Sequence, residues 1–256
     1  MTTLDRDLRS RYLDLMRRNL TRAGLQQRLP ESWSLRRRML FRLIMKTTPA
    51  RWPPEAETMI GMERLRSLQD CVETVLAEEV PGDLIECGVW RGGACIMMRA
   101  VLAAYGDDTR SVWLADSFAG LPRPDPEKYK ADKGLRLDLF TPILGVSEEE
   151  VRANFQRYDL LDDRVRFLPG WFKDTLEHAP IDQIAVLRLD GDLYESTIQA
   201  LDALYPRLSP GGFCVVDDYY AIEACRQAVT DYRAKNGISE DIVDIDWSGV
   251  LWRKQS

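Results

Sequence analysis

Four aspartates that follow two short apolar runs are the residues of this chain best suited to chemistry. Asp190 and Asp192 follow one run, and Asp217 and Asp218 follow the next. If each run is a buried parallel strand, all four side chains stand at the carboxyl edge of one sheet, where open α/β sheets bind their ligands. Carboxylates gathered there would repel one another, and a hard cation such as Mg²⁺ removes that repulsion by taking their oxygens as ligands. We therefore expect Asp190, Asp217 and Asp218 to bind Mg²⁺; the alternative is that they only cap the helices that follow.

A second candidate site surrounds a glycine-bearing turn earlier in the chain. One apolar run ends in Glu86 and is followed by Gly88, Gly92 and Gly93, and the next apolar run ends in Asp116. The glycine spacing is not the G-x-G-x-x-G of dinucleotide-binding proteins. Glycines nevertheless let a ligand approach the backbone, and an acidic residue at the end of the second strand is placed to bind ribose hydroxyls. We expect this turn to bind a nucleoside-type donor; the alternative is a purely structural turn.

The two candidate sites together predict a metal-assisted group transfer. A metal ion would hold a hydroxyl group of the acceptor as a Lewis acid and lower its pKa. A carboxylate among the metal ligands or their neighbours would then take the proton.

The elements that position these residues alternate between short apolar runs and helical stretches, which is typical of parallel βαβ units. We expect strands at residues 83–87, 111–115, 164–168, 184–189 and 212–216. We expect helices to follow most of them, at residues 93–105, 147–157, 194–207 and 221–235. At the C-terminus, residues 242–247 and 250–252 flank a Ser-Gly pair and predict a hairpin with a two-residue turn. The expected fold is therefore α/β and Rossmann-like, with a mostly parallel seven-stranded sheet and an antiparallel C-terminal hairpin.

The N-terminal part has a different pattern. It predicts Arg-rich amphipathic helices at residues 5–22 and 35–46, and a longer helix follows at residues 58–79. In the first helix the expected apolar face consists of Leu8, Tyr12, Leu15, Met16 and Leu20. We expect residues 1–56 to form a helical arm and lid that belongs to the same domain as the Rossmann-like part, residues 57–256. Residues 120–146 lack a clear period and contain several prolines, so we expect a functional loop, such as a lid.

Charge is distributed unevenly along the chain. Residues 1–51 contain 13 Lys and Arg against 4 Asp and Glu, whereas the remainder contains 22 against 37. The acidic body argues against nucleic acid as a partner. For the basic arm we expect contact with another subunit of a homo-oligomer, and an anionic partner or membrane surface is the alternative.

Other features exclude several classes of protein. No apolar run approaches the ~20 residues that a membrane span needs, and the N-terminus lacks the apolar core of a signal peptide. The five cysteines form no CxxC pair, and the single histidine, His178, argues against a His-based triad or a zinc site. We expect a cytoplasmic protein that does not bind membranes.

Several motifs together resemble the macrocin O-methyltransferase family, whose members use S-adenosylmethionine and Mg²⁺ to methylate deoxysugar hydroxyls of macrolide and aminocoumarin antibiotics. The similarity covers residues 57–119 and 147–256. The motifs that carry it are Thr58-Met-Ile-Gly-Met-Glu-Arg-Leu65, Glu86-Cys-Gly-Val-Trp-Arg-Gly-Gly-Ala-Cys95, Ala115-Asp-Ser-Phe118, Asp190-Gly-Asp192, Tyr205-Pro-Arg-Leu-Ser-Pro-Gly-Gly212, Asp217-Asp-Tyr219 and Trp252-Arg253.

This resemblance implies roles for individual residues. Asp190, Asp217 and Asp218 match the metal ligands, and Asp190 is also the implied general base. The implied donor site for S-adenosylmethionine consists of Met59, Glu86, Gly88, Trp90, Gly92, Gly93, Asp116, Ser117, Gly170 and Trp171. Gly170 and Trp171 would flank the adenine, and Met59 would close over the donor.

The acceptor is less narrowly defined, because residues 1–56 and 120–146 depart from the macrolide enzymes. The implied acceptor is a sugar hydroxyl of a glycosylated natural product in antibiotic biosynthesis. A phenolic or catechol-like acceptor is the alternative, although Leu193 stands where catechol O-methyltransferases of animals carry a catalytic lysine. A third hypothesis is a family member that binds a donor or partner without catalysis.

Overall fold

The computed structural model describes residues 3–23, 29–47 and 52–255. Its centre is a seven-stranded sheet with the strand order β3-β2-β1-β4-β5-β7-β6. The parallel strands are β1 (Asp83–Cys87), β2 (Val112–Asp116), β3 (Val165–Pro169), β4 (Ile184–Leu189) and β5 (Leu208–Val216). The edge is completed by the antiparallel strands β7 (Val250–Arg253) and β6 (Val243–Asp244). The expected Rossmann-like fold is confirmed, and its strand order reverses between β1 and β4, where such sheets open a ligand crevice.

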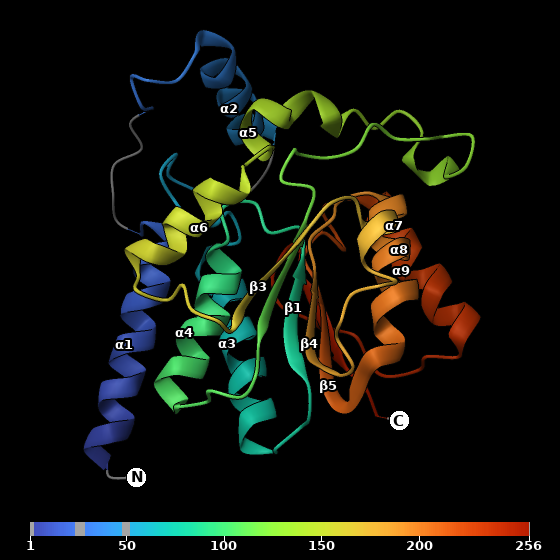
Figure 1. Ribbon diagram of the computed structural model, residues 1–256. Helices are drawn as coiled ribbons and strands as arrows, with labels where there is room; N and C mark the ends of the chain where they lie inside the picture. The colour runs from blue at the N-terminus through green and yellow to red at the C-terminus, as the bar shows by residue number, and fades with distance from the viewer. Residues whose placement is uncertain (1–2, 24–28, 48–51, 256) are drawn as a thin grey trace.

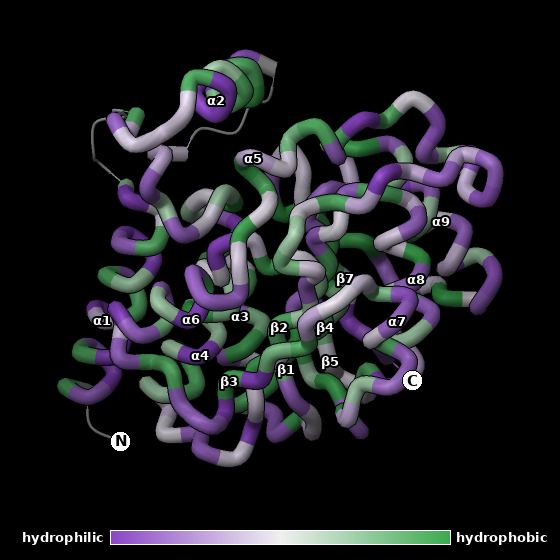
Figure 2. Tube along the Cα trace, turned by 45° about the horizontal axis from the view of Figure 1, so that its top comes forward, coloured by the Kyte–Doolittle hydropathy of each residue, from purple (hydrophilic) through white to green (hydrophobic). Residues whose placement is uncertain are grey.

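Helices cover both faces of the sheet (Figure 1). One face carries α1 (Thr3–Thr21), α3 (Gly61–Ala77), α4 (Gly93–Tyr105) and α6 (Glu148–Arg157). The other face carries α7 (Phe172–Thr175), α8 (Tyr194–Leu204), the 3-10 turn η3 (Tyr205–Arg207) and α9 (Glu223–Asn236). Each face has its own buried apolar core, and the central strands form a mostly hydrophobic band between the helices in Figure 2. Strands buried on both faces are expected to be rich in Val, Ile and Leu, as these are.

Helix α1 confirms the predicted N-terminal helix, but its apolar face differs from the expected one. Leu8 and Leu15 are each 56% exposed, whereas Leu13, Met16 and Leu20 are buried in the core shared with α3 and α4. The buried residues recur at intervals of three and four, so they form the stripe that a 3.6-residue period places toward the core.

Helix α2 (Leu35–Thr47) belongs to a third, smaller core. Phe41, Trp52, Ala56 and Ile143 are buried there, and the ring of Phe41 meets those of Trp33 and Trp52 edge to face. This small core joins the N-terminal region to α5 (Thr141–Leu144) at the end of the molecule where the sheet crevice opens.

Residues 120–146 are more ordered than a structureless loop. They contain the 3-10 helices η1 (Lys130–Asp132) and η2 (Leu137–Phe140) as well as α5. Asp132 is fully buried and accepts hydrogen bonds from the backbone N–H groups of Tyr194 (2.7 Å) and Glu195 (3.0 Å). A carboxylate from this segment thus caps the N-terminus of α8, which has no side-chain cap of its own.

The C-terminal hairpin corrects one prediction. Strand β6 ends at Asp244 and β7 begins at Val250, so residues 245–249 form a loop instead of a two-residue turn. The carboxylate of Asp246 accepts hydrogen bonds from the backbone N–H groups of Ser248 and Gly249, and these bonds stabilise a turn that the strand pattern does not show.

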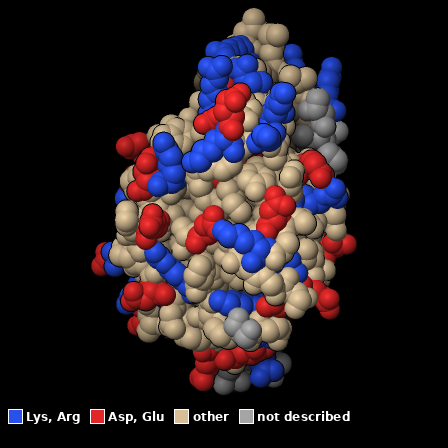
Figure 3. All heavy atoms as spheres, turned by 90° about the vertical axis from the view of Figure 1, so that its right-hand side faces the viewer, with Lys and Arg blue, Asp and Glu red and all other residues tan. Residues whose placement is uncertain are grey.

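The surface reflects the uneven charge of the chain. Figure 3 shows Lys and Arg side chains gathered at the upper end of the face it presents, where α2 and residues 120–146 lie in Figure 1. Among the described residues, no helix is long and apolar enough to cross a membrane.

Candidate active site

The turn after β1 passes unusually close to the end of β4. Gly88 has a φ of 89°, and a Cβ atom there would lie 1.9 Å from the backbone oxygen of Asp190. Only glycine fits this approach, because any side chain would overlap the neighbouring strand end. The turn therefore brings the predicted donor site and the predicted metal site into direct contact.

Asp116 at the end of β2 holds this turn in place. Its carboxylate accepts hydrogen bonds from the backbone N–H groups of Val89 (2.7 Å) and Phe118 (2.8 Å). Burial raises the pKa of Asp116, and these backbone donors oppose the rise. Each carboxylate oxygen can accept more than one hydrogen bond, so Asp116 retains capacity for ligand hydroxyls.

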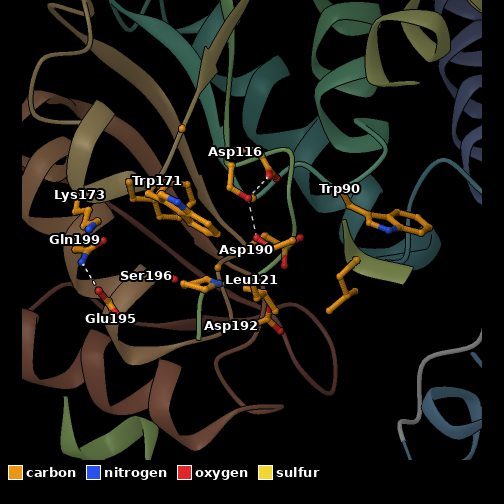
Figure 4. A pocket seen from close by; sticks show the side chains of 18 of the residues that line it. Trp90, Asp116, Leu121, Trp171, Lys173, Asp190, Asp192, Glu195, Ser196 and Gln199 are labelled. Atoms are coloured by element: carbon orange, nitrogen blue, oxygen red, sulfur yellow. Dashed lines mark hydrogen bonds between the residues drawn. The ribbon is translucent and has the colours of Figure 1, made fainter. Parts of the chain in front are cut away.

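A cavity of about 360 Å³ opens at the carboxyl ends of the strands. It is lined by eight of the predicted site residues, namely Met59, Gly88, Trp90, Asp116, Ser117, Gly170, Trp171 and Asp190. In Figure 4 the indoles of Trp171 and Trp90 lie on opposite sides of Asp116 and Asp190. Trp90 is fixed by a 2.9 Å hydrogen bond from Nε1 to the backbone oxygen of Ile143 in α5.

The remaining predicted donor residues do not line the cavity. Gly92 ends the turn as the N-cap of α4 in the left-handed conformation, and a Cβ atom there would lie 2.8 Å from Val151. A Cβ atom on Gly93 would lie 2.5 Å from the backbone oxygen of Glu57. These two glycines allow α4 to pack closely against its neighbours.

Glu86 in β1 is not among the residues that line the cavity. Its side chain is almost fully buried, accepts a hydrogen bond from Cys95 Sγ (2.8 Å) and forms an ion pair with Arg188. Burial raises its pKa to about 7, and the positive charge of Arg188 opposes that rise. Glu86 thus contacts the groups that support the site, and no contact in the described structure directs it toward the cavity.

The three predicted metal ligands converge. One oxygen from each of Asp190, Asp217 and Asp218 lies within 4.8 Å of the others. Oδ2 of Asp218 is buried, and among the described residues it has no hydrogen-bond partner. An all-oxygen donor set with a buried unpaired acceptor suits a hard cation such as Mg²⁺.

The electrostatics of this cluster also favour a cation. Burial together with the charge of Asp190 raises the pKa of Asp217 to about 6, against the opposing effects of Arg188 and Arg64. Burial and the charges of Asp190 and Asp217 raise the pKa of Asp192 to about 8. Burial and the neighbouring aspartates also raise the pKa of Asp218 well above its usual range. The two arginines therefore do not balance the full negative charge that these aspartates would carry when ionised.

Sequence reasoning missed several residues of the site. Arg188 lies inside an apolar run and Arg64 inside an amphipathic helix, so neither pattern marks them, yet both form ion pairs with Asp217. Another wall of the cavity contains Glu195, Ser196 and Gln199, at the start of α8. Their position in the first two turns of the helix after Asp190-Gly-Asp192 is the signal that could have identified them.

Comparisons with known proteins agree with this geometry. The family model for macrocin-O-methyltransferase (TylF) matches residues 9–254. A tetracenomycin-C rhamnosyl 4'-O-methyltransferase of Streptomyces olivaceus is 61% identical over 202 residues, which are 79% of this chain and 77% of that protein. The demethyldecarbamoylnovobiocin O-methyltransferase of Streptomyces niveus is 49% identical over 245 residues, which are 96% of this chain and 94% of that protein.

A solved structure supports the same assignment. The O-methyltransferase NovP superposes with a TM-score of 0.87 at 48% identity, and the match covers 97% of this chain and 100% of that one. The calicheamicin methyltransferase CalS11 shares the fold with a TM-score of 0.61 at 19% identity. The chain therefore belongs to the macrocin O-methyltransferase family and is an O-methyltransferase.

Proposed function

We propose that this enzyme transfers the methyl group of S-adenosylmethionine to a sugar hydroxyl of a glycosylated natural product, with Mg²⁺ bound by Asp190, Asp217 and Asp218. The observation that carries the proposal is the convergence of these three carboxylates, one with a buried unpaired oxygen, beside a cavity that the glycine turn and Asp116 line. The names of the relatives support the acceptor class, because the tetracenomycin enzyme is named for a substrate that carries a rhamnosyl group. A mycinamicin III 3''-O-methyltransferase of Micromonospora griseorubida is 53% identical over 207 residues.

The donor would occupy the cavity between the two tryptophans. Gly88 lets the donor approach the backbone of the turn, and Asp116 would accept hydrogen bonds from its ribose hydroxyls. Trp171, which is 37% exposed at the cavity wall, would flank the adenine together with Gly170. Met59 and Trp90 would cover the other side and exclude water from the reacting atoms.

On the acceptor side, Mg²⁺ would supply Lewis-acid chemistry that lowers the pKa of the acceptor hydroxyl. Asp190 would take the hydroxyl proton at Oδ1, since Oδ2 accepts a hydrogen bond from Arg188 (2.8 Å). Asp192 lines the same cavity and is the neighbouring carboxylate that could accept the proton instead. Methyl transfer also requires alignment of donor and acceptor, which the close contact of the Gly88 turn with Asp190 would maintain.

We extend the proposal to the N-terminal region. Met59, Trp90 and Leu144 line the cavity and pack on the small core of Phe41 and Trp52. This packing supports the predicted lid for the described part of residues 1–56; residues 1–2, 24–28 and 48–51 lie outside the described structure. Exposed Leu8 and Leu15 on α1 and the basic charge of the arm support a subunit contact within a homo-oligomer. All five cysteines are buried free thiols, which supports a cytoplasmic location.

A product assay tests the proposal. The enzyme would be incubated with S-adenosylmethionine and either Mg²⁺ or a chelator, and each reaction would contain a deoxysugar glycoside, its free aglycone or a catechol. We expect methylation of the glycoside on its sugar, which the chelator abolishes. Turnover of the catechol or aglycone alone would contradict the assignment of a sugar hydroxyl as acceptor. Turnover that persists in the presence of the chelator would contradict the requirement for Mg²⁺.

A further inference from the structure

A charged side chain lies inside the most deeply buried strand of the sheet. All six residues of β4 are buried, and Arg188 within it is only 1% exposed. Burial of a guanidinium is costly unless its charge and its N–H groups are paired. Its position is informative, because Arg188 stands two residues before Asp190 on the same face of the strand and pairs in register with Glu86 of β1.

The guanidinium of Arg188 links the ends of three neighbouring strands. Its Nη1 contacts Glu86 of β1 and donates to Oδ2 of Asp190 at the end of β4 (2.8 Å). Its Nη2 contacts Oδ1 of Asp217 at the end of β5. The side chain of Arg188 thus contacts two of the proposed metal ligands and also β1, the strand that leads into the glycine turn.

A second arginine approaches Asp217 from another direction. Arg64 of α3 contacts Oδ2 of Asp217 through Nη1, and its Nε donates to Oδ2 of Asp246 in the β6–β7 loop (3.0 Å). Oδ1 of Asp217 therefore accepts a hydrogen bond from Arg188, and Oδ2 accepts one from Arg64. A carboxylate held at both oxygens cannot rotate about its side-chain bonds without breaking an ion pair.

Neutralisation of charge alone does not explain this arrangement. A lysine would supply the same charge but lacks the planar fork that spans several carboxylates. A well-packed apolar group in place of a buried ion pair is often neutral or stabilising, so stability does not require the pairs either. What the two arginines add is a fixed orientation of the metal ligands.

We propose that Arg188, together with Arg64, is a positioning residue that fixes Asp217 and Asp190 in the orientation in which they bind the metal ion. This inference rests on the proposed Mg²⁺-dependent function. Arg188 also links the metal site to the glycine turn after β1, since it pairs with Glu86 only two residues before Gly88.

Arg188→Lys and Arg64→Lys test this role. Mg²⁺ would be titrated calorimetrically into each variant saturated with S-adenosylhomocysteine, and S-adenosylhomocysteine would be titrated without Mg²⁺. Partners that orient metal ligands typically change metal affinity by 10–100-fold, so we expect Mg²⁺ binding to weaken by about 10-fold or more in both variants. Affinity for S-adenosylhomocysteine without metal should stay within about three-fold, or about 0.6 kcal/mol.

Arg99→Lys is the matched control. Arg99 of α4 is also a buried arginine with a carboxylate partner, Asp162 in the segment before β3, and neither residue lines the cavity. Its Mg²⁺ affinity should equal that of the wild type, and a loss as large as that of Arg188→Lys would overturn the proposal.

The outcomes separate this inference from the proposed function. Wild-type Mg²⁺ affinity in both site variants overturns the positioning role and leaves the function intact. Failure of the wild type to bind Mg²⁺ overturns both. If thermal denaturation shows that Arg188→Lys is unfolded, Arg64→Lys decides, because it leaves Arg188 and Glu86 paired: weaker Mg²⁺ binding supports the proposal and unchanged binding overturns it.

Discussion

The two halves of the carboxyl edge of the sheet contain different kinds of chemical group. At the ends of β1, β2 and β3, the cavity is formed by glycines, backbone N–H groups and a single aspartate whose hydrogen bonds are made within the protein. At the ends of β4 and β5, Asp190 and Asp192 line the cavity. Two buried arginines form ion pairs with Asp217, and one oxygen of Asp218 has no hydrogen-bond partner among the described residues.

This difference implies different dependences on ligand. The first half, which we call the donor half, is shaped by close packing, so its geometry should persist without a ligand. The second half, the metal half, contains excess negative charge that a cation would relieve. Substitutions in the donor half should therefore act through packing and hydrogen bonding, and those in the metal half through the charge and orientation of the metal ligands.

The largest effect is expected for Asp190→Asn in the metal half. Loss of a general base typically costs 10²–10⁴-fold, so we expect turnover to fall by about 10³-fold. Affinity for S-adenosylhomocysteine should stay within a few-fold, because the donor half is unchanged. Steady-state kinetics and calorimetry measure the two quantities, and Asp192→Asn is the comparison. A greater loss of turnover in Asp192→Asn would assign the base to Asp192.

Gly88→Ala should be the most damaging change in the donor half. The added methyl group would overlap the backbone oxygen of Asp190, and φ would remain in the left-handed region. Overpacking and backbone strain each cost about 1–3 kcal/mol, so we expect the free energy of unfolding to fall by about 3 kcal/mol or more.

Gly106→Ala is its control, since Gly106 also has positive φ, but no atom of the described residues beyond its own helix end lies within 4 Å of the added methyl group. It should cost only about 1 kcal/mol. Equal losses in urea denaturation would show that the close approach of the turn to β4 does not matter.

Asp116→Asn should weaken donor binding by about 10-fold, or about 1.4 kcal/mol, because the amide offers one acceptor atom fewer for both the turn and the ribose. Mg²⁺ affinity should be unchanged in the same titration series. A parallel loss of Mg²⁺ affinity would break the distinction between the two halves.

The smallest effect is a gain. Asp218→Asn removes a carboxyl group whose pKa is raised by burial and by the neighbouring aspartates, so at neutral pH and in the presence of chelator the free energy of unfolding should rise by about 1 kcal/mol. Mg²⁺ should no longer change the stability of this variant. A decrease in stability under chelator would mean that Asp218 supports the fold instead of a metal ion.

Most of the fold was predicted from the alternation of apolar runs and helical stretches in the sequence. Strand–helix alternation predicted β1 and β4 to the residue, and the helix expected at residues 147–157 is found as α6, for which Ser147 is the N-cap. The β6–β7 loop was missed because the side chain of Asp246, and not a glycine pair, determines its turn.

In the site, position at strand ends predicted the convergence of Asp190, Asp217 and Asp218 and the place of Gly88 and Asp116 at the cavity. The family resemblance added the other predicted residues that line it, Met59, Trp90, Ser117, Gly170 and Trp171. It could not show that Glu86 turns inward or that Arg188 and Arg64 support the aspartates. These contacts join β1, β4, β5 and α3, and sequence periodicity does not reveal which charged side chains meet after folding.

The donor and metal sites are tested together by calorimetric titration of S-adenosylhomocysteine, and then of Mg²⁺, into the wild type and Asp217→Ala. We expect the wild type to bind both, and the variant to retain S-adenosylhomocysteine binding but lose the Mg²⁺ signal. Failure of the wild type to bind S-adenosylhomocysteine, or an undiminished Mg²⁺ signal in Asp217→Ala, would contradict the account.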